Sequence, residues 1–363
     1  MISVCDRLEA LAVRGLGPAM FRRLVTRFGS WAAARSASVA DLVSVAGAKR
    51  PLARAICEGR WEFEPDEEFS RAERLGVTFV TDEDEAYPPG LKHLEDAPIL
   101  LYVRGTLEAA DALSIGVVGT RRCSVYGQTQ AERLSGGLAS AGMTVVSGLA
   151  RGIDAAAHRG ALRAKGRTLA VMGCGLAHMY PPEHDELADL ISQSGALVSE
   201  VSLLTKPRPT NFPARNRIIA SISLGLLVVE APLQSGALIT ARFAGELGRE
   251  IFAVPGEVSR PQSRGCHALI RDGAKIVGDV HDILDEMEST RGLLTASQEP
   301  EPVPPRLNPV ERAVYETLAE APKDIDQIVR EASLPASNAA SALLAMELRG
   351  LVRQLPGKRF RRA

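Results

Sequence analysis

Between Pro65 and Met287, short apolar runs alternate with segments of helical periodicity, and this alternation constrains the fold more than any other feature of the chain. The runs are almost continuously apolar, which is typical of parallel strands that are covered on both faces. Strands that alternate with helices form βαβ units, so we expect a doubly wound α/β sheet. The expected strands are Thr78–Val80, Ser114–Val118, Met143–Val146, Thr168–Met172, Ala196–Val198, Leu226–Val229 and Ile251–Val254.

The segment before this region has a helical pattern with two glycine turn signals, Gly15-Leu16-Gly17-Pro18 and Val45-Ala46-Gly47. A Gly-x-Gly turn between two short helices resembles a helix-hairpin-helix, whose backbone amides can approach a DNA phosphate. Short glycine turns are also common in small helical bundles that only pack against a neighbouring domain. We expect a small helical domain over residues 1–62 and leave both roles open.

The stretch Thr295–Pro309 is proline-rich and predicts a structureless linker. Three helical patterns and a short hairpin with a basic end follow it, which together predict a winged helix. The third pattern carries no arginine or lysine before Arg349, so we expect a partner or regulatory module rather than a reader of DNA bases. The helical patterns are Val310–Glu320, Asp324–Ala332 and Ala336–Arg349, and the predicted domains are 1–62, 63–290 and 307–363, with a linker at 291–306.

The composition excludes several classes of protein. The chain has 363 residues and a formal net charge of −1, so a nucleic-acid site must come from local clustering of basic residues. Aromatic residues make up only 4%, which argues against a broad stacking platform. The five cysteines are scattered and form no CxxC pair, which indicates reduced thiols in a cytoplasmic protein. The sequence has no secretory signal pattern and no bilayer-length apolar run, so we expect no membrane insertion.

We also expect no metal and no cofactor. Gly173-Cys174-Gly175 follows a predicted strand but lacks the third glycine of a dinucleotide-binding loop. His178 and His184 lack partners at metal-ligand spacing. The sequence contains no GxxxxGK[ST] motif, so it has no P-loop for ATP.

The strongest functional feature is the loop Gly119–Gly127, GTRRCSVYG, which follows a predicted strand and opens a helix. Unpaired backbone amides and the helix dipole favour an anion at such a position. Arg121 adds a forked donor, Ser124 adds a hydroxyl, and Gly119 allows close approach of the backbone. The alternative is an ordinary strand-to-helix turn with an exposed arginine.

A second loop, Ser147–Asp154, also follows a predicted strand, so it should lie beside the first in an open α/β sheet. Asp154 is placed to cap the helix that carries His158. The two could be mistaken for an acid–base pair, but no nucleophile with a matching base accompanies them. We therefore expect no catalytic site.

The third feature is FPARNR, Phe212–Arg217, which lies in a stretch with four cations and no acidic residue, Val201–Val229. A basic stretch with one aromatic residue suits a DNA backbone groove, and a solvated charged face is the alternative. A fourth loop, Ser235–Ala241, follows the strand that ends at Glu230. Helix capping by Ser235 is its simpler explanation.

These motifs, in this order, resemble those of the DprA (Smf) family. The similar segments lie between Tyr87 and Ala274 and read YPPGLKHLEDAPILLYVRG, GTRRCSVYG, SGLARGIDAAAH, MGCGLAHMYPPEH, FPARNRIIA, VVEAPLQSGALITA and AVPGEVSRPQSRGCHALIRDGA. The chain departs from the family at Thr120, where serine is common, and at Val201–Thr210, which is unlike the usual glycine- and proline-rich approach to FPxRNR.

The resemblance implies an extended Rossmann domain that binds single-stranded DNA without catalysis, forms a homodimer and loads RecA recombinase onto incoming DNA in natural transformation. Single-strand binding protein is a further candidate partner. A SAM-like or helix-hairpin-helix N-terminus and a winged helix also occur in the family, variably between members. The residues that we expect at the DNA are Gly119, Thr120, Arg121, Ser124, Gly127, Ser147, Gly148, Arg151, Lys206, Phe212, Arg215, Asn216 and Arg217.

Two other functions are weighed against this one. LOG-type phosphoribohydrolases share a related Rossmann fold and use a PGGxGTxxE motif, but the comparable segment here, Gln234–Thr240, lacks the glutamate that would act as base. A regulator that binds duplex DNA through the winged helix is the third hypothesis.

Overall fold

The computed structural model describes residues 2–44, 48–287, 307–318, 323–332, 334–348, 352–355 and 359–362. The chain forms two compact units, Met1–Leu293 and Leu294–Ala363. Across the described segments, no helix is long and apolar enough to cross a membrane. The predicted turn Val45–Gly47, most of the predicted linker and the tip of the C-terminal hairpin lie outside the described residues.

A nine-stranded sheet forms the centre of the first unit, in the order β1-β2-β6-β5-β4-β3-β7-β8-β9. All neighbours from β6 to β9 pair in parallel, whereas β2 is antiparallel to both β1 and β6. The predicted doubly wound α/β sheet is confirmed. The strands are β1 (Val77–Thr81), β2 (Leu100–Gly105), β3 (Ser114–Val118), β4 (Thr144–Ser147), β5 (Thr168–Val171), β6 (Ala196–Ser199), β7 (Gly225–Val228), β8 (Glu250–Ala253) and β9 (Lys275–Ile276).

Two strands of the sheet, β2 and β9, were not predicted from the sequence. Leu100–Val103 is as apolar and as buried as the predicted strands. It falls outside the βαβ alternation, because a short 3₁₀ turn, Ala109–Ala112, and not a helix connects it to β3. The strand β9 has only two exposed residues, which are too few to give a periodic signal.

Helices cover both faces of the sheet. Ile115 and Val117 of β3 pack with α7 and α8, while Val118 faces the opposite layer, with α10 and α11. This alternation is the period of two that a strand imposes on its side chains. The helices of the unit after the first strand include α7 (Val125–Ser140), α8 (Ile153–Arg163), α9 (Asp185–Ser194), α10 (Asn211–Ile222), α11 (Gly236–Glu246) and α12 (Arg264–Arg271).

The strand order reverses between β3 and β7. The chain runs outward in one direction from β3 through β4 and β5 to β6, and then returns to β7 on the other side of β3. In an open α/β sheet, the carboxyl ends of the two strands at such a switch point flank the crevice where ligands bind. The loop Gly119–Gly127 follows one of these strands, and Glu230 follows the other.

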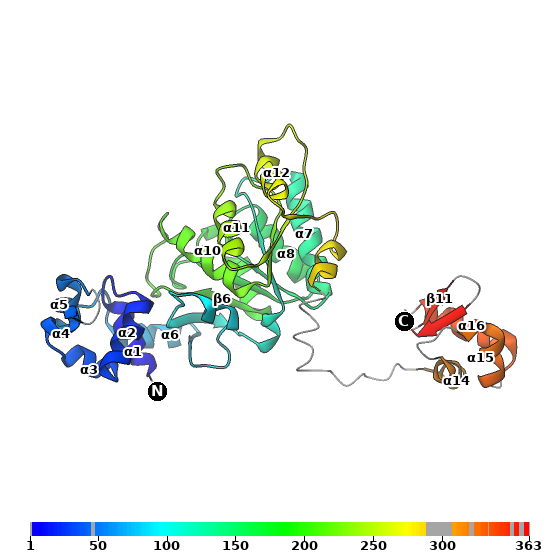
Figure 1. The fold of residues 1–363 in the computed structure, drawn as a ribbon, viewed down its shortest axis with the longest axis horizontal. Helices are drawn as coiled ribbons and strands as arrows, with labels where there is room; N and C mark the ends of the chain where they lie inside the picture. The colour runs from blue at the N-terminus through cyan, green and yellow to red at the C-terminus, as the bar shows by residue number, and fades with distance from the viewer. Residues whose placement is uncertain are drawn as a thin grey trace. The chain divides into compact units, whose positions relative to one another are not determined.

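The N-terminal helices share a hydrophobic core with the edge of the sheet. Buried residues such as Leu8 and Trp31 belong to the same cluster as Tyr102 of β2 and Ile191 of α9. These helices form the blue end of the chain in Figure 1. They are α1 (Val4–Ala12), α2 (Pro18–Phe28), α3 (Trp31–Ser36), α4 (Val39–Ser44), α5 (Arg50–Glu58) and α6 (Pro65–Arg74).

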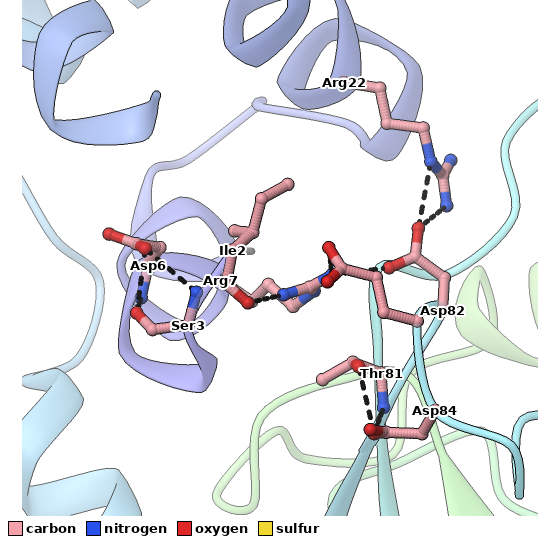
Figure 2. A network of polar contacts seen from close by, with 9 residues as sticks. Ile2, Ser3, Asp6, Arg7, Arg22, Thr81, Asp82 and Asp84 are labelled. Carbon is pink, nitrogen blue, oxygen red and sulfur yellow. Dashed lines mark hydrogen bonds and ion pairs between the residues drawn. The ribbon is translucent and has the colours of Figure 1, made fainter. Parts of the chain in front are cut away.

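A buried arginine also ties these helices to the sheet. The Arg7 side chain of α1 is 1% exposed and donates to Asp82 and Glu83, just after β1, each over 2.8 Å. Figure 2 shows this network, in which Arg22 of α2 also pairs with Asp82, over 2.9 Å. Removing Asp82 would leave Glu83 as the remaining acid that the structure shows beside this buried cation, which would weaken the attachment of α1 to the sheet.

The second unit is the predicted winged helix. Its core joins Val314, Ile328 and Leu343 of three helices to Val352 and Phe360 of the hairpin. One short strand, β10, was not predicted, and it pairs with β12 at the edge of the hairpin. The elements are α14 (Pro309–Thr317), β10 (Lys323–Asp324), α15 (Ile325–Ala332), α16 (Ala336–Leu348), β11 (Val352–Leu355) and β12 (Arg359–Arg362).

Candidate nucleic-acid interface

A cleft of about 690 Å³ opens at the switch point between β3 and β7, and we call it the switch-point cleft. Its walls include the loop after β3, the loop after β7 and the start of α10, segments that are far apart in the sequence. The residues that line it include Gly119, Thr120, Arg121, Arg122, Asp154, Tyr180, Phe212, Arg215, Asn216, Gln234, Ser235, Gly236 and Gln262.

Glu230, which is 2% exposed, fixes the loop Gly119–Gly127 by accepting hydrogen bonds from it. The Glu230 carboxylate accepts the Ser124 backbone N–H over 2.8 Å and the Ser124 hydroxyl over 2.5 Å. The backbone oxygen of Glu230 accepts the Thr120 N–H over 2.7 Å. A Cβ atom at Gly127 would lie 2.3 Å from this carboxylate, so only glycine fits there. Glu230 was not among the predicted site residues, although it is an acid placed directly after a wholly apolar strand.

These contacts give Ser124 a structural role. Its hydroxyl caps α7, because it accepts the Gly127 N–H over 3.1 Å while it donates to Glu230. Gly119 is likewise fixed by packing, since a Cβ there would lie 2.4 Å from Ile153 Cγ1. Both glycines at the ends of the loop are therefore explained without a ligand.

Arg121 and Phe212 meet at the cleft. The Arg121 side chain is exposed, and its guanidinium carbon lies 4.9 Å from the centre of the Phe212 ring. Phe212 is half-buried, and its ring centre lies 5.5 Å from that of Tyr180. A cation over an aromatic face is a stabilising contact. It places an exposed cation and a flat ring side by side, and Thr120 also lines the cleft.

Arg215 lies beneath this surface and is 4% exposed. Its guanidinium donates to the backbone oxygens of Gly148, over 3.0 Å, and Val171, and its Nε donates to Asn216 Oδ1 over 3.2 Å. Burial lowers the pKa of Arg215 to about 10, which still leaves it charged at neutral pH. Burial also raises the pKa of the nearby Asp154 carboxyl, and Arg215 opposes that shift.

The second predicted loop is packed against Arg215. A Cβ atom at Gly148 would lie 2.4 Å from the Arg215 guanidinium, and the buried Ser147 hydroxyl donates to Val117 O over 2.6 Å. Arg151 is half-exposed and forms a bidentate pair with Glu183. Of this loop, only Arg151 presents a cation to solvent.

The remaining predicted residues differ in exposure. Arg217 is 11% exposed and pairs with Asp96 over 3.1 Å and with Glu200 over 2.5 Å. Asn216 donates to Gly236 O over 3.3 Å, which holds the start of α11. Lys206 is exposed in the loop before α10. The structure thus gathers Arg121, Phe212 and Thr120 at the mouth of the cleft and turns Arg215 and Arg217 inward.

Asp154 and His158 have structural partners. Asp154 accepts the Ala150 N–H over 3.3 Å. His158 is fully buried, and its Nδ1 lies 2.7 Å from the Thr168 hydroxyl. Burial lowers the pKa of His158 to about 3, so it is neutral at physiological pH. Among the described residues, no group of histidine, cysteine and acidic side chains could hold a metal ion.

Comparison with known proteins decides the family. Residues 78–288 match the family model of DNA recombination-mediator protein A, and residues 298–358 match that of the DprA winged helix domain. The chain belongs to the DprA/Smf family. It is 33% identical to protein Smf of Synechocystis sp. over 96% of both chains, and 41% identical to protein Smf of Escherichia coli over 77% of both.

Two solved DprA structures resemble the fold. DprA of Streptococcus pneumoniae matches with a TM-score of 0.68 and 33% identity, over 79% of this chain and 99% of that one. DprA of Helicobacter pylori matches with a TM-score of 0.54 and 28% identity, over 60% of this chain and 98% of that one, and its structure describes a single-stranded DNA binding mode. As a member of the DprA/Smf family, the chain is a DNA-processing protein of the recombination-mediator type.

Proposed function

We propose that the chain binds single-stranded DNA at the switch-point cleft without catalysis, and that it protects incoming DNA and delivers RecA to it in natural transformation. The main support for a DNA site here is the position of the Arg121 guanidinium in the cleft, over the Phe212 ring and 4.9 Å from the ring centre. An arginine next to an aromatic ring can bind a phosphate and support the neighbouring base of a single strand. A duplex, whose bases are stacked inside, cannot offer both groups at one point.

The proposed contacts with DNA follow from which side chains are exposed to solvent. Arg121 clamps a phosphate, with the backbone of Gly119 and Thr120 beside it. Lys206 and Arg151 extend the positive surface, whereas Arg215, Arg217, Ser124, Gly127, Ser147 and Gly148 support the loops from within. The single-stranded DNA described for the Helicobacter pylori relative supports the choice of ligand.

The proposed protein partners follow from the family to which the chain belongs. A recombination mediator acts on a recombinase, and we propose that RecA is the partner, with single-strand binding protein as a second one on coated DNA. This activity places the protein in the cytoplasm. We also propose a homodimer through the Rossmann domain, with Leu269 and Ile270 of α12, both half-buried, in the interface.

The test of the DNA site is a salt titration of single-stranded DNA binding. The slope of the logarithm of the binding constant against the logarithm of the salt concentration is called here the log–log salt slope. Each lost phosphate contact should lower its magnitude by about 0.7. We expect Arg121→Ala to show this loss on every sequence, with the fold intact. Arg242→Ala is the matched control, because Arg242 is 80% exposed on α11 and lies outside the cleft lining. Equal affinity and slope for wild type and Arg121→Ala would exclude this site.

A further inference from the structure

The N-terminal helices carry a second concave surface. An open groove of about 840 Å³ lies between the start of α2 and the start of α5, and we call it the N-terminal groove. It shares no lining residue with the switch-point cleft. The residues that line it are Arg14, Gly15, Met20, Lys49, Pro51, Leu52, Ala55, Arg60, Trp61 and Glu62.

This part of the chain is basic. Residues 1–62 contain ten arginines and lysines against five aspartates and glutamates, an excess of five positive charges, although the whole chain has a net charge of −1. Arg7 and Arg22 are neutralised by the acids after β1, and Arg35 pairs with Glu9. Of the seven other cations, Arg14, Lys49 and Arg60 line the groove.

Lys49 lies in the groove wall, and Arg50 and Arg54 follow it on α5, one turn apart. All three are exposed, and none forms an ion pair with any residue that the structure describes. Arg14 and Arg60 have acidic neighbours, Glu62 at 3.5 Å and Glu58 at 2.5 Å, but both pairs are largely exposed. Exposed pairs of this kind contribute little energy, so these arginines can turn to a stronger anion.

The rest of the groove is apolar and holds one aromatic ring. Met20, Leu52 and Ala55 form its wall, and Trp61 lines it with a half-buried indole. The Trp61 Nε1 is shielded from solvent and has no hydrogen-bond partner among the described residues. A single phosphate ion would satisfy one cation and leave this wall uncovered. A ligand that repeats anionic and flat apolar groups matches both parts of the groove.

We infer that the N-terminal groove is a second binding surface for single-stranded DNA, in which the phosphates contact Lys49 and Arg60 and a base packs against Trp61 and Met20. Single-stranded DNA provides phosphates and unstacked bases together, and one aromatic residue with a few cations is enough for a contact without sequence preference. The inference does not depend on DNA binding at the switch-point cleft, because the two surfaces have separate residues.

Two measurements on the full chain test it. The variant Lys49→Ala/Arg60→Ala should lower the magnitude of the log–log salt slope for a long oligothymidylate by about 1.4, the sum expected for two lost phosphate contacts. The matched control is Arg27→Ala/Arg74→Ala, which removes two exposed cations outside the groove lining and should leave the slope unchanged. An unchanged slope in the groove variant would overturn the inference, even if Arg121→Ala abolishes binding.

Tryptophan fluorescence gives a local readout. The chain has only two tryptophans, and Trp31 is 1% exposed beneath the helices. A base packed on Trp61 should quench its emission, so we expect oligothymidylate to quench the wild type and Arg121→Ala, and to leave Trp61→Phe unquenched. Equal quenching in Trp61→Phe, or equal quenching of the wild type by blunt duplex DNA, would contradict single-stranded DNA in this groove.

Discussion

The Ser124 hydroxyl donates to Glu230 Oε1 over 2.5 Å, and this bond joins the loop after β3 to the carboxyl end of β7. Ser124 is the N-cap of α7, at the end of the loop after β3, and Glu230 lies two residues beyond β7. The contact therefore fixes the shape of the loop that carries Arg121. Ser124 is thus engaged within the fold, whereas Arg121 is exposed and forms no ion pair with the residues that the structure describes.

We predict that Glu230→Ala weakens both folding and DNA binding. The substitution leaves the Ser124 N–H and hydroxyl without an acceptor, and an unsatisfied buried donor costs about 1–3 kcal/mol. Urea unfolding should show that loss, and single-stranded DNA affinity should fall because the loop is no longer held. Arg121→Ala should lower the affinity for single-stranded DNA and leave the free energy of unfolding unchanged. A Glu230→Ala protein with wild-type stability and affinity would show that the loop does not need this support.

Arg215→Met should destabilise the fold far more than Arg121→Ala. The substitution removes donors from two buried backbone oxygens and leaves Asp154 without its nearest buried cation. Breaking a buried charge network typically costs about 3–5 kcal/mol. Chemical unfolding of the two variants measures the difference. Equal stability of Arg215→Met and Arg121→Ala would contradict the supporting role of Arg215.

The sequence predicted every parallel strand except the two-residue β9, and the loops at their carboxyl ends, because buried strands and helices have distinct periods. It could not show which arginines and lysines are exposed and which are buried. Arg121 and Arg215 both occur in loop-to-helix segments, and which of them faces solvent depends on packing between elements. One signal was available: Arg215 lies three and four residues before the apolar Ile218 and Ile219, on the same helical face. The partner of Ser124 could not be predicted, since it is 106 residues away.

The α12 surface should govern self-association. Ile270→Arg places a charge in the half-buried apolar patch that we propose for the dimer interface, and a buried unpaired charge opposes association. We expect the wild type to have a dimer mass in solution at micromolar concentration and Ile270→Arg to have a monomer mass. Leu190→Arg, on α9 with the native side chain 52% exposed, is the control and should remain a dimer. A monomeric wild type would refute the proposed interface.

The winged helix should contribute little to DNA affinity. The described part of α16, Ala336–Leu348, has no arginine or lysine, and phosphate contacts need cations on the helix that enters a groove. A chain that ends after Met287 should therefore keep the salt slope of the full chain on single-stranded DNA. Tight, sequence-selective binding of duplex DNA by residues 307–363 would contradict a partner or regulatory role.

The buried imidazole of His158 should make stability depend on pH. The Thr168 hydroxyl donates to Val145 O over 2.7 Å, so it accepts from His158 Nδ1, which fixes the neutral tautomer. Protonation would add a second N–H, on Nε2, which is buried and has no partner among the described residues. This desolvation accounts for the lowered pKa, about 3 in the fold against an ordinary value of 6.5.

We predict that His158 lowers stability as the pH falls below 6.5. Between 6.5 and about 3, the unfolded chain binds a proton at this site and the folded chain does not, so protonation favours unfolding. The free energy of unfolding should fall by about 1.4 kcal/mol per pH unit within that window, and the loss should be absent above it. Urea unfolding at several pH values measures this fall in stability.

His158→Gln should flatten the dependence of stability on pH, because an amide can still donate to Thr168 but does not titrate. His93→Gln, at an exposed position, should leave the dependence as in the wild type, and a wild-type slope in His158→Gln would contradict the assignment.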